Sequence, residues 1–514
     1  MPSADLVLKN ANVVTMDPAQ PHAELVAAKG DRILFVGRNA DFDLVKGNRT
    51  RVIDCQGKTV VPGFNDAHCH IFSYLRKLLS IDLSPQYVRS ISDIKGLIKA
   101  KADTTPSGQW ISGTDYNEFY LSEKRHPSRR EIDEVAPNHP VVLSHRSLHA
   151  CVLNSRALAL AGITHETPEP SGALIERDPN GEPTGLLFDM LGHIRQNVMP
   201  PFLQDELEKS VYLANQHYLS QGITSLQDAT VTNDLSRWQK LKRFKDESRL
   251  KSRVYMMFGH RAISDFKNEG LSFGDGDASL RLGGVKFILT EPRGQIYPSQ
   301  PELDEMVFSA HRAGFPVAAH AFSPAHVEAA ITAFENARKR LPGIKSRHRI
   351  EHCAECPSDF LERLKASQAV VVTQPPFVYY SGERYLATIP AAQVEWLYRF
   401  RLFLRNGIIA AASSDSPLVP DNPLMGIYAA VTRQTQAGQY LVPDESISAG
   451  EALAMYTINA AYASHEEGIK GSLTSGKLAD MVILSADLMQ IAPEEIKDIT
   501  MGMTILGGEV VWEG

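Results

Sequence analysis

Short apolar segments alternate with amphipathic helical segments through the middle of this 514-residue chain, and this alternation restricts the fold more than any other feature. Eight apolar runs have the length and composition of strands, at 60–70, 222–229, 253–259, 282–290, 316–322, 348–353, 368–376 and 408–417. Helical patterns lie in the gaps, at 207–221, 235–248, 301–314, 325–340 and 357–367. A repeat of strand and helix predicts a parallel sheet. Eight such strands predict an α/β fold whose sheet closes into a (β/α)8, TIM-like barrel.

The two ends of the chain show a different pattern, that of short strands separated by turns. Residues 6–60 and 468–514 carry apolar runs with partial period-two alternation, broken by Gly, Asn and Asp. Neither segment looks able to close a hydrophobic core alone. We therefore expect a small β-sandwich domain formed by both chain termini, with 1–61 and 468–514 as its two parts, around a barrel over 62–467.

Residues 74–206 depart from the rhythm of strand and helix and predict a large insertion after the first barrel strand. The segment holds Pro- and Gly-rich turns, helical pieces at 93–103 and 154–162, and a hairpin pattern at 172–185. The loops that follow the strands of a barrel surround its active site. We therefore expect the insertion to form a lid or substrate-binding subdomain over that site.

Four histidines lie at or near the ends of predicted barrel strands. His68 and His70 are separated by one residue on extended chain, so both imidazoles project from the same face. His320 and His352 each resemble an ordinary core histidine when taken alone, but parallel strands bring their C-terminal ends together. Neutral imidazole is a preferred ligand of zinc, so the set predicts a metal site. Asp66, two residues before His68, is expected to orient an imidazole.

Two further side chains each allow two interpretations. Asp415 lies in SSDSP after an apolar run. It either caps a following helix, or contacts the metal and takes a proton from bound water, which the histidines favour. Lys286 lies within GGVKFILT, where a cation is costly to bury. In one interpretation its charged amine reaches solvent or forms an ion pair. In the other it is a neutral amine, which CO₂ converts into a carbamate that bridges two metal ions.

Charge and cysteine content exclude several classes of partner. The net charge is −7, from 53 basic and 60 acidic residues without a basic block, so we expect no nucleic-acid partner. We expect no membrane partner and a cytoplasmic location, because no apolar run approaches the ~20 residues of a membrane span and the first residues lack a signal-peptide pattern. The odd number of cysteines, five, argues against a disulfide framework. Cys353 and Cys356 lack the second CxxC motif that would indicate a zinc or redox site.

The ordered set of candidate ligands resembles that of the metal-dependent amidohydrolase superfamily. The residues that carry the resemblance are His68 and His70 within PGFNDAHCH, then Lys286, His320, His352 and Asp415. The segment GSLTSGKLADMVILSADL is similar to the family's return to the β-sandwich. The insertion, with HRSLHACVLNSRALALAGI and GEPTGLL, resembles the YtcJ-like branch, which includes N-substituted formamide deformylases. The similarity covers nearly the whole chain.

The resemblance implies a hydrolase that cleaves a non-peptide carbon–nitrogen bond of a small molecule, in an amide, N-formyl, carbamate or cyclic amide group. It implies that His68 and His70 bind the more buried of two zinc ions together with Asp415. It places His320 and His352 on the second ion, with carboxylated Lys286 as the bridge. A metal-bound hydroxide would attack the carbonyl, and Asp415 would act as general base and then as acid toward the leaving nitrogen. The habit of the superfamily suggests a homodimer.

Several loops depart from the usual sequences of this branch, so a named substrate does not carry over. The departures are TEPRG after Lys286, HAFSPAH around His320 and QPPFVYYSGERY after the seventh strand. Candidate substrate contacts in the loops and the insertion are His149, Asn154, Arg293, Tyr379, Tyr380 and Arg384. For His149 and Asn154 the alternative is that they hold the lid in place.

Two other functions compete with this one. A mononuclear deaminase of an amino-substituted heterocycle typically carries a glutamate shortly after the histidine of the fifth strand, whereas Ala321, Phe322 and Ser323 follow here. A catalytically silent binding or regulatory barrel usually lacks a ligand, and this sequence has all of them. One metal ion with ammonia release would indicate the deaminase, and bound metal without turnover would indicate the silent barrel.

Overall fold

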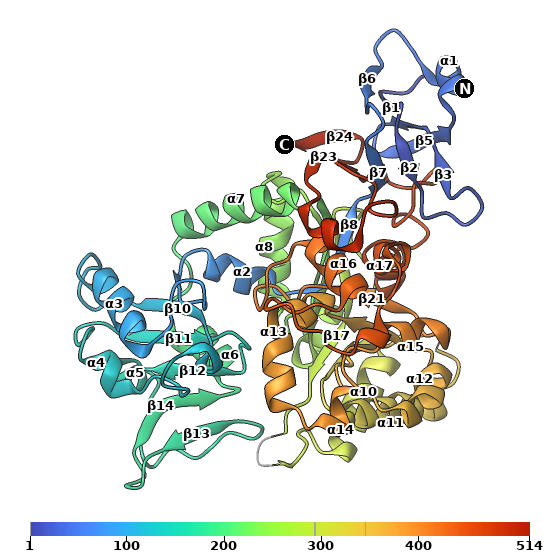
Figure 1. The fold of residues 1–514 in the computed structure, drawn as a ribbon. Coiled ribbons are helices and arrows are strands. Elements are labelled where there is room, and N and C mark those ends of the chain that lie inside the picture. The colour runs from blue at the N-terminus through green and yellow to red at the C-terminus, as the bar shows by residue number, and fades with distance from the viewer. Residues whose placement is uncertain (1, 292–293, 345) are drawn as a thin grey trace. The chain divides into compact units, whose positions relative to one another are not determined.

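The structure, a computed structural model, describes residues 2–291, 294–344 and 346–514, which group into two compact units (Figure 1). The first unit contains the residues up to 71 together with 212–288 and 300–514. The second contains 72–211 together with 289–299.

Eight parallel strands form the centre of the first unit and confirm the predicted barrel. In sheet order they are β8 (Phe64–Cys69), β15 (Ile223–Asp228), β16 (Arg253–Gly259), β17 (Leu280–Ile288), β18 (Val317–Ala321), β19 (Arg349–His352), β20 (Val370–Thr373) and β21 (Ala410–Ala412). Most of their residues are buried on both faces, as expected for a parallel sheet covered by helices. The continuous apolar runs in the sequence reflect this burial.

The first and last strands meet just beyond their C-terminal ends. Cys69 and Ser416 form a parallel bridge. The amide of His70 donates to the carbonyl of Ser416, and the amide of Asp415 donates to the carbonyl of His68, each over 2.8 Å. This junction brings two segments that are far apart in sequence to the same edge of the barrel.

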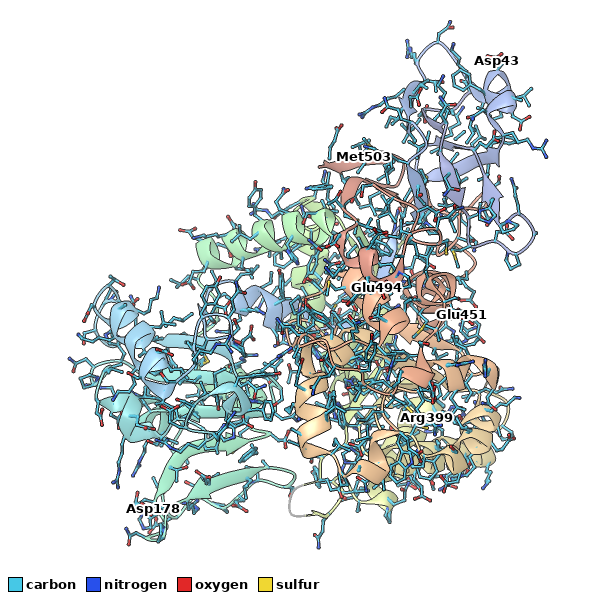
Figure 2. The ribbon with its side chains drawn as sticks, viewed as in Figure 1. Asp43, Asp178, Arg399, Glu451, Glu494 and Met503 are labelled. Atoms are coloured by element: carbon cyan, nitrogen blue, oxygen red, sulfur yellow. The ribbon has the colours of Figure 1, made fainter. Side chains whose placement is uncertain are left out.

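Amphipathic helices follow the barrel strands at the predicted places. They include α7 (Gln204–Ser220), α8 (Leu235–Asp246), α10 (Gln300–Arg312), α11 (Pro324–Arg340) and α12 (Leu361–Ser367). Helix α11 shows why one of them begins where it does, since the Ser323 side chain accepts from the amide of His326 and Pro324 occupies the first turn. Helix α17 (Ala449–Tyr456) begins with a capping box of Ser448 and Glu451, of which Glu451 is labelled in Figure 2.

Both ends of the chain contribute to the β-sandwich. One sheet has the order β5 (Arg32–Gly37), β4 (Leu25–Lys29), β1 (Leu6–Lys9) and β6 (Arg51–Asp54). The other has the order β24 (Glu509–Glu513), β23 (Met501–Leu506), β22 (Met481–Leu484), β7 (Thr59–Pro62), β2 (Asn12–Val14) and β3 (His22–Ala23). Strands β22 and β7 pair antiparallel, with Met481 opposite Pro62. Buried residues from both ends, such as Leu8 and Ile483, share one core.

A buried ion pair connects the barrel to the chain that enters the sandwich. Arg253, the first residue of β16, donates from Nε to Asp480 Oδ2 over 2.6 Å and from Nη2 to Asp480 Oδ1 over 2.8 Å. Asp480 directly precedes β22 and also accepts from the amide of Gly507. The two parts of the first unit are therefore held by a bidentate contact with little exposure to solvent.

The second unit has its own mixed sheet. Its order is β13 (Leu174–Arg177), β14 (Pro183–Phe188), β12 (Ala150–Leu153), β11 (Val141–His145), β10 (Ile111–Tyr116) and β9 (Ile81–Asp82). Strands β13 and β14 form the predicted hairpin, and α3 (Ile91–Ala102) and α5 (Ser155–Leu160) fall on the predicted helical pieces. Val141 packs in a core with α3, whereas Val142 packs in a second core with α5, as side-chain alternation along a strand requires.

All five cysteines are buried and free, which agrees with the expected absence of a disulfide framework. Among the described residues, no helix combines the length and apolar character needed to cross a membrane.

Candidate metal centre

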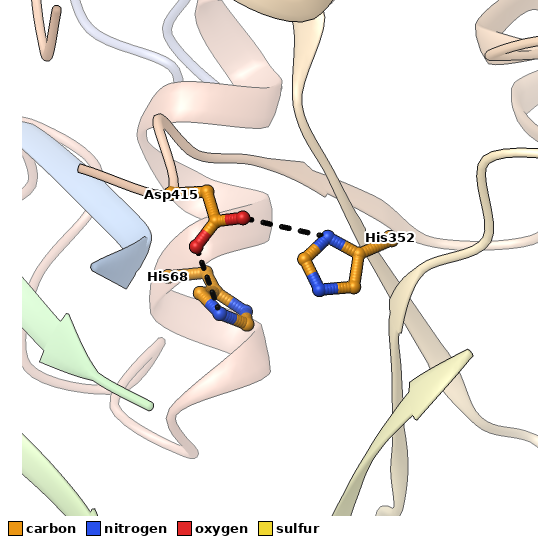
Figure 3. Close-up of side chains that lie close together, drawn as sticks. All are labelled: His68, His352 and Asp415. Carbon is orange, nitrogen blue, oxygen red and sulfur yellow. Dashed lines mark ion pairs between the residues drawn. The ribbon is translucent and has the colours of Figure 1, made fainter. Parts of the chain in front are cut away.

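The ends of the barrel strands bring two histidines and an aspartate, His68, His352 and Asp415, to one place (Figure 3). His68 is the next-to-last residue of β8, and His70 directly follows that strand. His352 is the last residue of β19, and Asp415 comes three residues after β21. His68, His352 and Asp415 offer ligand atoms that all lie within 4.8 Å of one another, and all three are buried.

The Asp415 carboxylate is the common neighbour of the imidazoles. Its Oδ1 lies 3.0 Å from Nε2 of His70 and 3.5 Å from Nε2 of His68. Its Oδ2 lies 3.9 Å from Nδ1 of His352. The imidazole of His320 is adjacent, with its ring centroid 4.5 Å from that of His352. Three of the predicted ligands thus lie around Asp415, and a fourth, His320, packs against His352.

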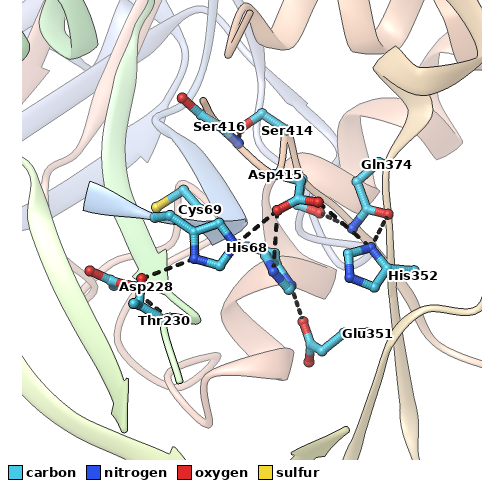
Figure 4. Close-up of polar contacts among 12 residues, drawn as sticks. His68, Cys69, Asp228, Thr230, Glu351, His352, Gln374, Ser414, Asp415 and Ser416 are labelled. Carbon is cyan, nitrogen blue, oxygen red and sulfur yellow. Dashed lines mark hydrogen bonds and ion pairs between the residues drawn. The ribbon is translucent and has the colours of Figure 1, made fainter. Parts of the chain in front are cut away.

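Each of three imidazoles has a partner on Nδ1 (Figure 4). The partner of His68 is Glu351, over 2.5 Å. The hydroxyl of Thr230 lies 2.9 Å from Nδ1 of His70, and Oε1 of Gln374 lies 2.8 Å from Nδ1 of His352. Metal-binding histidines are commonly held with one ring nitrogen bonded to the protein and the other directed at the ion. His68 and His70 follow this pattern, with Nε2 toward Asp415, whereas in His352 the nitrogen nearest Asp415 is Nδ1 itself.

Lys286 lies on β17 with only 2% of its surface exposed, which excludes the interpretation that its charge extends to solvent. Its Nζ has no hydrogen-bond partner among the described residues. Burial lowers the pKa of Lys286 to about 8, although Glu351 and Asp415 act in the opposite direction. A buried amine without a partner points to a group that would complete its contacts.

Burial sets the charge state of His68 and His352. It lowers the pKa of His68 to about 3 and that of His352 to about 4, so both imidazoles are neutral at pH 7. Burial alone would raise the pKa of Asp415, but the surrounding imidazoles outweigh it and hold this pKa well below its usual range. Neutral imidazole and ionised carboxylate are the forms that bind metal ions.

Two of the candidate ligands have left-handed backbone conformations. His352 has φ of +73° and Asp415 has φ of +60°. In a regular strand Glu351 and His352 would point to opposite faces, yet Glu351 contacts His68 while His352 contacts Asp415. Because the backbone departs from strand geometry at His352, the side chains of Glu351 and His352 both face the candidate metal centre. Such conformations are costly and concentrate at functional sites.

The donor set fits a divalent metal ion. Imidazole nitrogens and a carboxylate are the ligands that zinc prefers, and they converge here at the strand ends where barrel enzymes place their chemistry. The unpartnered Lys286 amine lies in the same barrel, two residues before the end of β17. Asp415 does not cap a helix, because the next long helix, α16 (Pro423–Thr432), is capped by Asn422.

The expectation for Asp66 is wrong. Its carboxylate accepts from the amide and hydroxyl of Ser414, over 3.0 and 2.5 Å, and from the amide of His68 over 3.3 Å. Asp66 therefore holds the backbone that carries the ligands, and Glu351 is the carboxylate that contacts an imidazole. The sequence contained a signal for Glu351, since it shares a strand face with Arg349 directly before His352.

The candidate substrate residues are dispersed. Tyr379, Tyr380 and Arg384 lie on helix α13 (Pro375–Thr388) and not on the expected loop, because Pro375 and Pro376 start a helix directly after β20. The Tyr379 and Tyr380 rings are 5.0 Å apart, and Arg384 stacks over Tyr385. Arg293 lies outside the described residues.

The other two candidates belong to the second unit. His149 is partly exposed and contacts Asp189 over 2.6 Å. Asn154 is fully buried, and its side chain caps α5, accepts from the amide of Val141 and donates to the carbonyl of His139. We therefore assign Asn154 a structural role inside its unit, which corresponds to the alternative of holding the insertion in place.

Comparison with known proteins places this geometry in context. Residues 51–512 match the family model described as the amidohydrolase family. The chain is 29% identical to N-substituted formamide deformylase of Arthrobacter pascens, over 99% of this chain and 98% of the relative. It is 28% identical to YtcJ of Bacillus subtilis (strain 168), over 90% of this chain and 91% of the relative.

A solved structure gives a similar result. The crystal structure of an uncharacterised metal-dependent hydrolase from Pyrococcus furiosus superposes with a TM-score of 0.72 at 25% identity. The superposition covers 94% of this chain and 100% of that one.

Proposed function

Because this chain belongs to the amidohydrolase family, we propose that it is a metal-dependent hydrolase of a non-peptide carbon–nitrogen bond in a small molecule. The bond belongs to an amide, N-formyl, carbamate or cyclic amide group. The observation that carries the proposal is the convergence of His68, His70 and His352 on the Asp415 carboxylate at the ends of the barrel strands. The similarity to a formamide deformylase over nearly the full length supports this class of bond.

We assign two zinc ions to the centre. His68, His70 and Asp415 would hold one, and His320 and His352 the other. Lys286 would bridge them as a carbamate, formed when its neutral amine adds to CO₂ and loses a proton. The burial of Lys286 and its lowered pKa support this, because they increase the share of neutral amine. When bound, a divalent ion polarises a carbonyl group and makes a coordinated water more acidic.

Asp415 moves the proton in this proposal. Its carboxylate is ionised at neutral pH and lies against three imidazoles, so it is ready to accept a proton from the attacking water. It then donates that proton to the leaving nitrogen, so that an amine departs and a carboxylic acid remains. His68 and His352 stay neutral throughout and keep their Nδ1 partners.

The substrate would be selected by residues around the centre. We propose Tyr379, Tyr380 and Arg384 of α13 as contacts that bind polar or aromatic parts of the substrate. His149 remains a further candidate for a substrate contact. Alanine at a true contact should raise KM more than it lowers kcat.

We place the reaction in the cytoplasm, because five free cysteines fit a reducing compartment. We propose a homodimer, from the habit of the superfamily. Gel filtration with light scattering would give the mass of the assembly.

Metal analysis combined with a substrate screen tests the proposal. The purified chain should contain about two zinc ions, gain activity with bicarbonate, and release an amine from an N-formyl, N-acyl, carbamate or lactam compound. One metal ion with release of ammonia from an amino-substituted ring would instead indicate a deaminase. Bound metal without turnover on the whole panel would refute a hydrolase of this class.

A further inference from the structure

A buried chain of charged and polar side chains leads away from His68 into the barrel. Glu351 is fully buried; its Oε1 accepts from Nε of Arg349 over 2.7 Å, and its Oε2 accepts from Nη2 over 3.0 Å. The same Oε2 lies 2.5 Å from Nδ1 of His68. Arg349 is 2% exposed and donates to Oε1 of Gln227 over 2.5 Å and to the carbonyl of Ala67 over 2.7 Å.

Burying these polar and charged side chains in the barrel interior costs free energy. Branched apolar side chains usually occupy the interior, and an ion pair taken out of water seldom stabilises a protein more than apolar residues of the same size. Gln227 is itself held, since its Nε2 donates to Asn65 and to the carbonyl of Ala460. The chain of contacts therefore calls for an explanation other than stability.

The contacts determine which nitrogen of His68 carries the proton. An ionised carboxylate only accepts hydrogen bonds, so Nδ1 of His68 must be the protonated nitrogen. The lone pair then lies on Nε2, the atom directed at Asp415. Arg349 donates two hydrogen bonds to Glu351 and so keeps the carboxylate in one orientation. The guanidinium of Arg349 cannot lose its charge.

We infer that Arg349 and Glu351 are positioning residues that select the metal-binding tautomer of His68, with Gln227 as the anchor of Arg349. This rests on the proposed metal-dependent function and adds to it a set of residues that touch neither metal nor substrate. The pair would present Nε2 in the correct state before any ion arrives.

The substitution Glu351→Gln tests the inference at the level of one atom. Both oxygens of Glu351 face N–H donors, but glutamine has only one oxygen. Its NH₂ group must therefore face either Arg349 or His68. In the first case Nε of Arg349 loses its acceptor. In the second Nη2 of Arg349 loses its acceptor, and the proton of His68 moves to Nε2 and blocks coordination. We expect zinc affinity about 10–100-fold lower, measured by competition with a chromogenic chelator on the full chain.

Two comparisons separate positioning from a structural role. Arg347→Met is the matched control, because Arg347 lies two residues earlier and pairs over 2.9 Å with Glu467 away from the ligands; it should leave zinc affinity unchanged. The double variant Arg349→Met/Glu351→Leu replaces the ion pair with apolar side chains. We expect its melting temperature to recover relative to Glu351→Gln, while its zinc affinity stays low because His68 has no acceptor.

Recovery of zinc affinity together with stability in the double variant would overturn the inference. If the double variant does not fold, Glu351→Asp decides, since it retains a carboxylate and should bind zinc more tightly than Glu351→Gln. Equal affinity of wild type, Glu351→Asp and Glu351→Gln would also overturn it. A wild-type chain that binds no zinc would be a failure of the proposed function, which is a different result.

Discussion

Zinc should raise the melting temperature of the metal-free protein, and His70→Ala should remove most of this effect. All six candidate ligands belong to the first unit, which has about 360 residues. Unfolding entropy of about 2.1 cal/mol/K per residue gives this unit about 0.8 kcal/mol/K. Zinc at 100 times its Kd adds about 2.7 kcal/mol per occupied site to the free energy of unfolding. The expected rise is therefore about 3–4 °C for one bound ion and about 7 °C for two.

His70→Ala is informative because its direct cost can be worked out separately. The His70 side chain is 19% exposed and has two contacts of hydrogen-bond length, with Thr230 over 2.9 Å and with the Asp415 carboxylate over 3.0 Å. Their loss costs about 1 kcal/mol for the hydroxyl and about 1.5–3 kcal/mol for the carboxylate, so the metal-free variant should melt about 3–5 °C lower. The loss of a ligand, in contrast, should abolish most of the rise with zinc and the turnover that depends on it.

The assay is scanning calorimetry of chelator-treated protein, with and without zinc. His165→Ala is the control for adventitious binding, because His165 is 61% exposed and lies in the second unit. The control should respond to zinc as the wild type does. An equal rise in His70→Ala and wild type would refute the assignment of His70 as a ligand.

Three further predictions follow from the same contacts. Asp415→Asn should lower kcat about 100–10,000-fold, and asparagine tolerates the backbone φ of +60° at this position. The control Asp421→Asn should change kcat only a few-fold, and similar losses in both variants would contradict the role of Asp415. Burial lowers the pKa of His348 from 6.5 to about 3, so below pH 6.5 the unfolded chain binds a proton at this side chain that the folded chain does not bind. The free energy of unfolding should therefore fall as the pH decreases from 6.5 toward 3. His348→Gln should make the melting temperature less dependent on pH in this range, and an unchanged dependence would contradict this role of His348. Asp480→Asn breaks the buried ion pair with Arg253. It should lower the free energy of unfolding, measured in urea, by about 3–5 kcal/mol and leave zinc affinity unchanged. A decrease of less than about 1 kcal/mol would contradict the importance of this contact.

The barrel was predictable because its strands are buried on both faces. Such strands appear in the sequence as continuous apolar runs, and a polar residue at the end of one is conspicuous. His68, His70 and Asp415 could be recognised in this way, and the closing contact of β8 with the segment after β21 brings them together.

Other features depend on neighbours that spacing does not reveal. Glu351 contacts His68 from β19, which lies five positions from β8 in the order of the sheet, so the partner of the imidazole was misassigned to nearby Asp66. Left-handed backbone at His352 directs consecutive side chains to the same place, against the alternation on which strand arguments depend. Residues 289–299 group with the second unit through tertiary contacts that no local pattern indicates.

The pairing of β7 with β22 has a consequence for biosynthesis. The two strands are separated by more than 400 residues, and a ribosome adds roughly 5–20 residues per second. Strand β7 therefore waits roughly 20 to 80 s with one apolar edge open, which is a template for wrong pairing with other nascent chains. Slower translation lengthens this exposure, and only the emergence of residues 481–484 ends it.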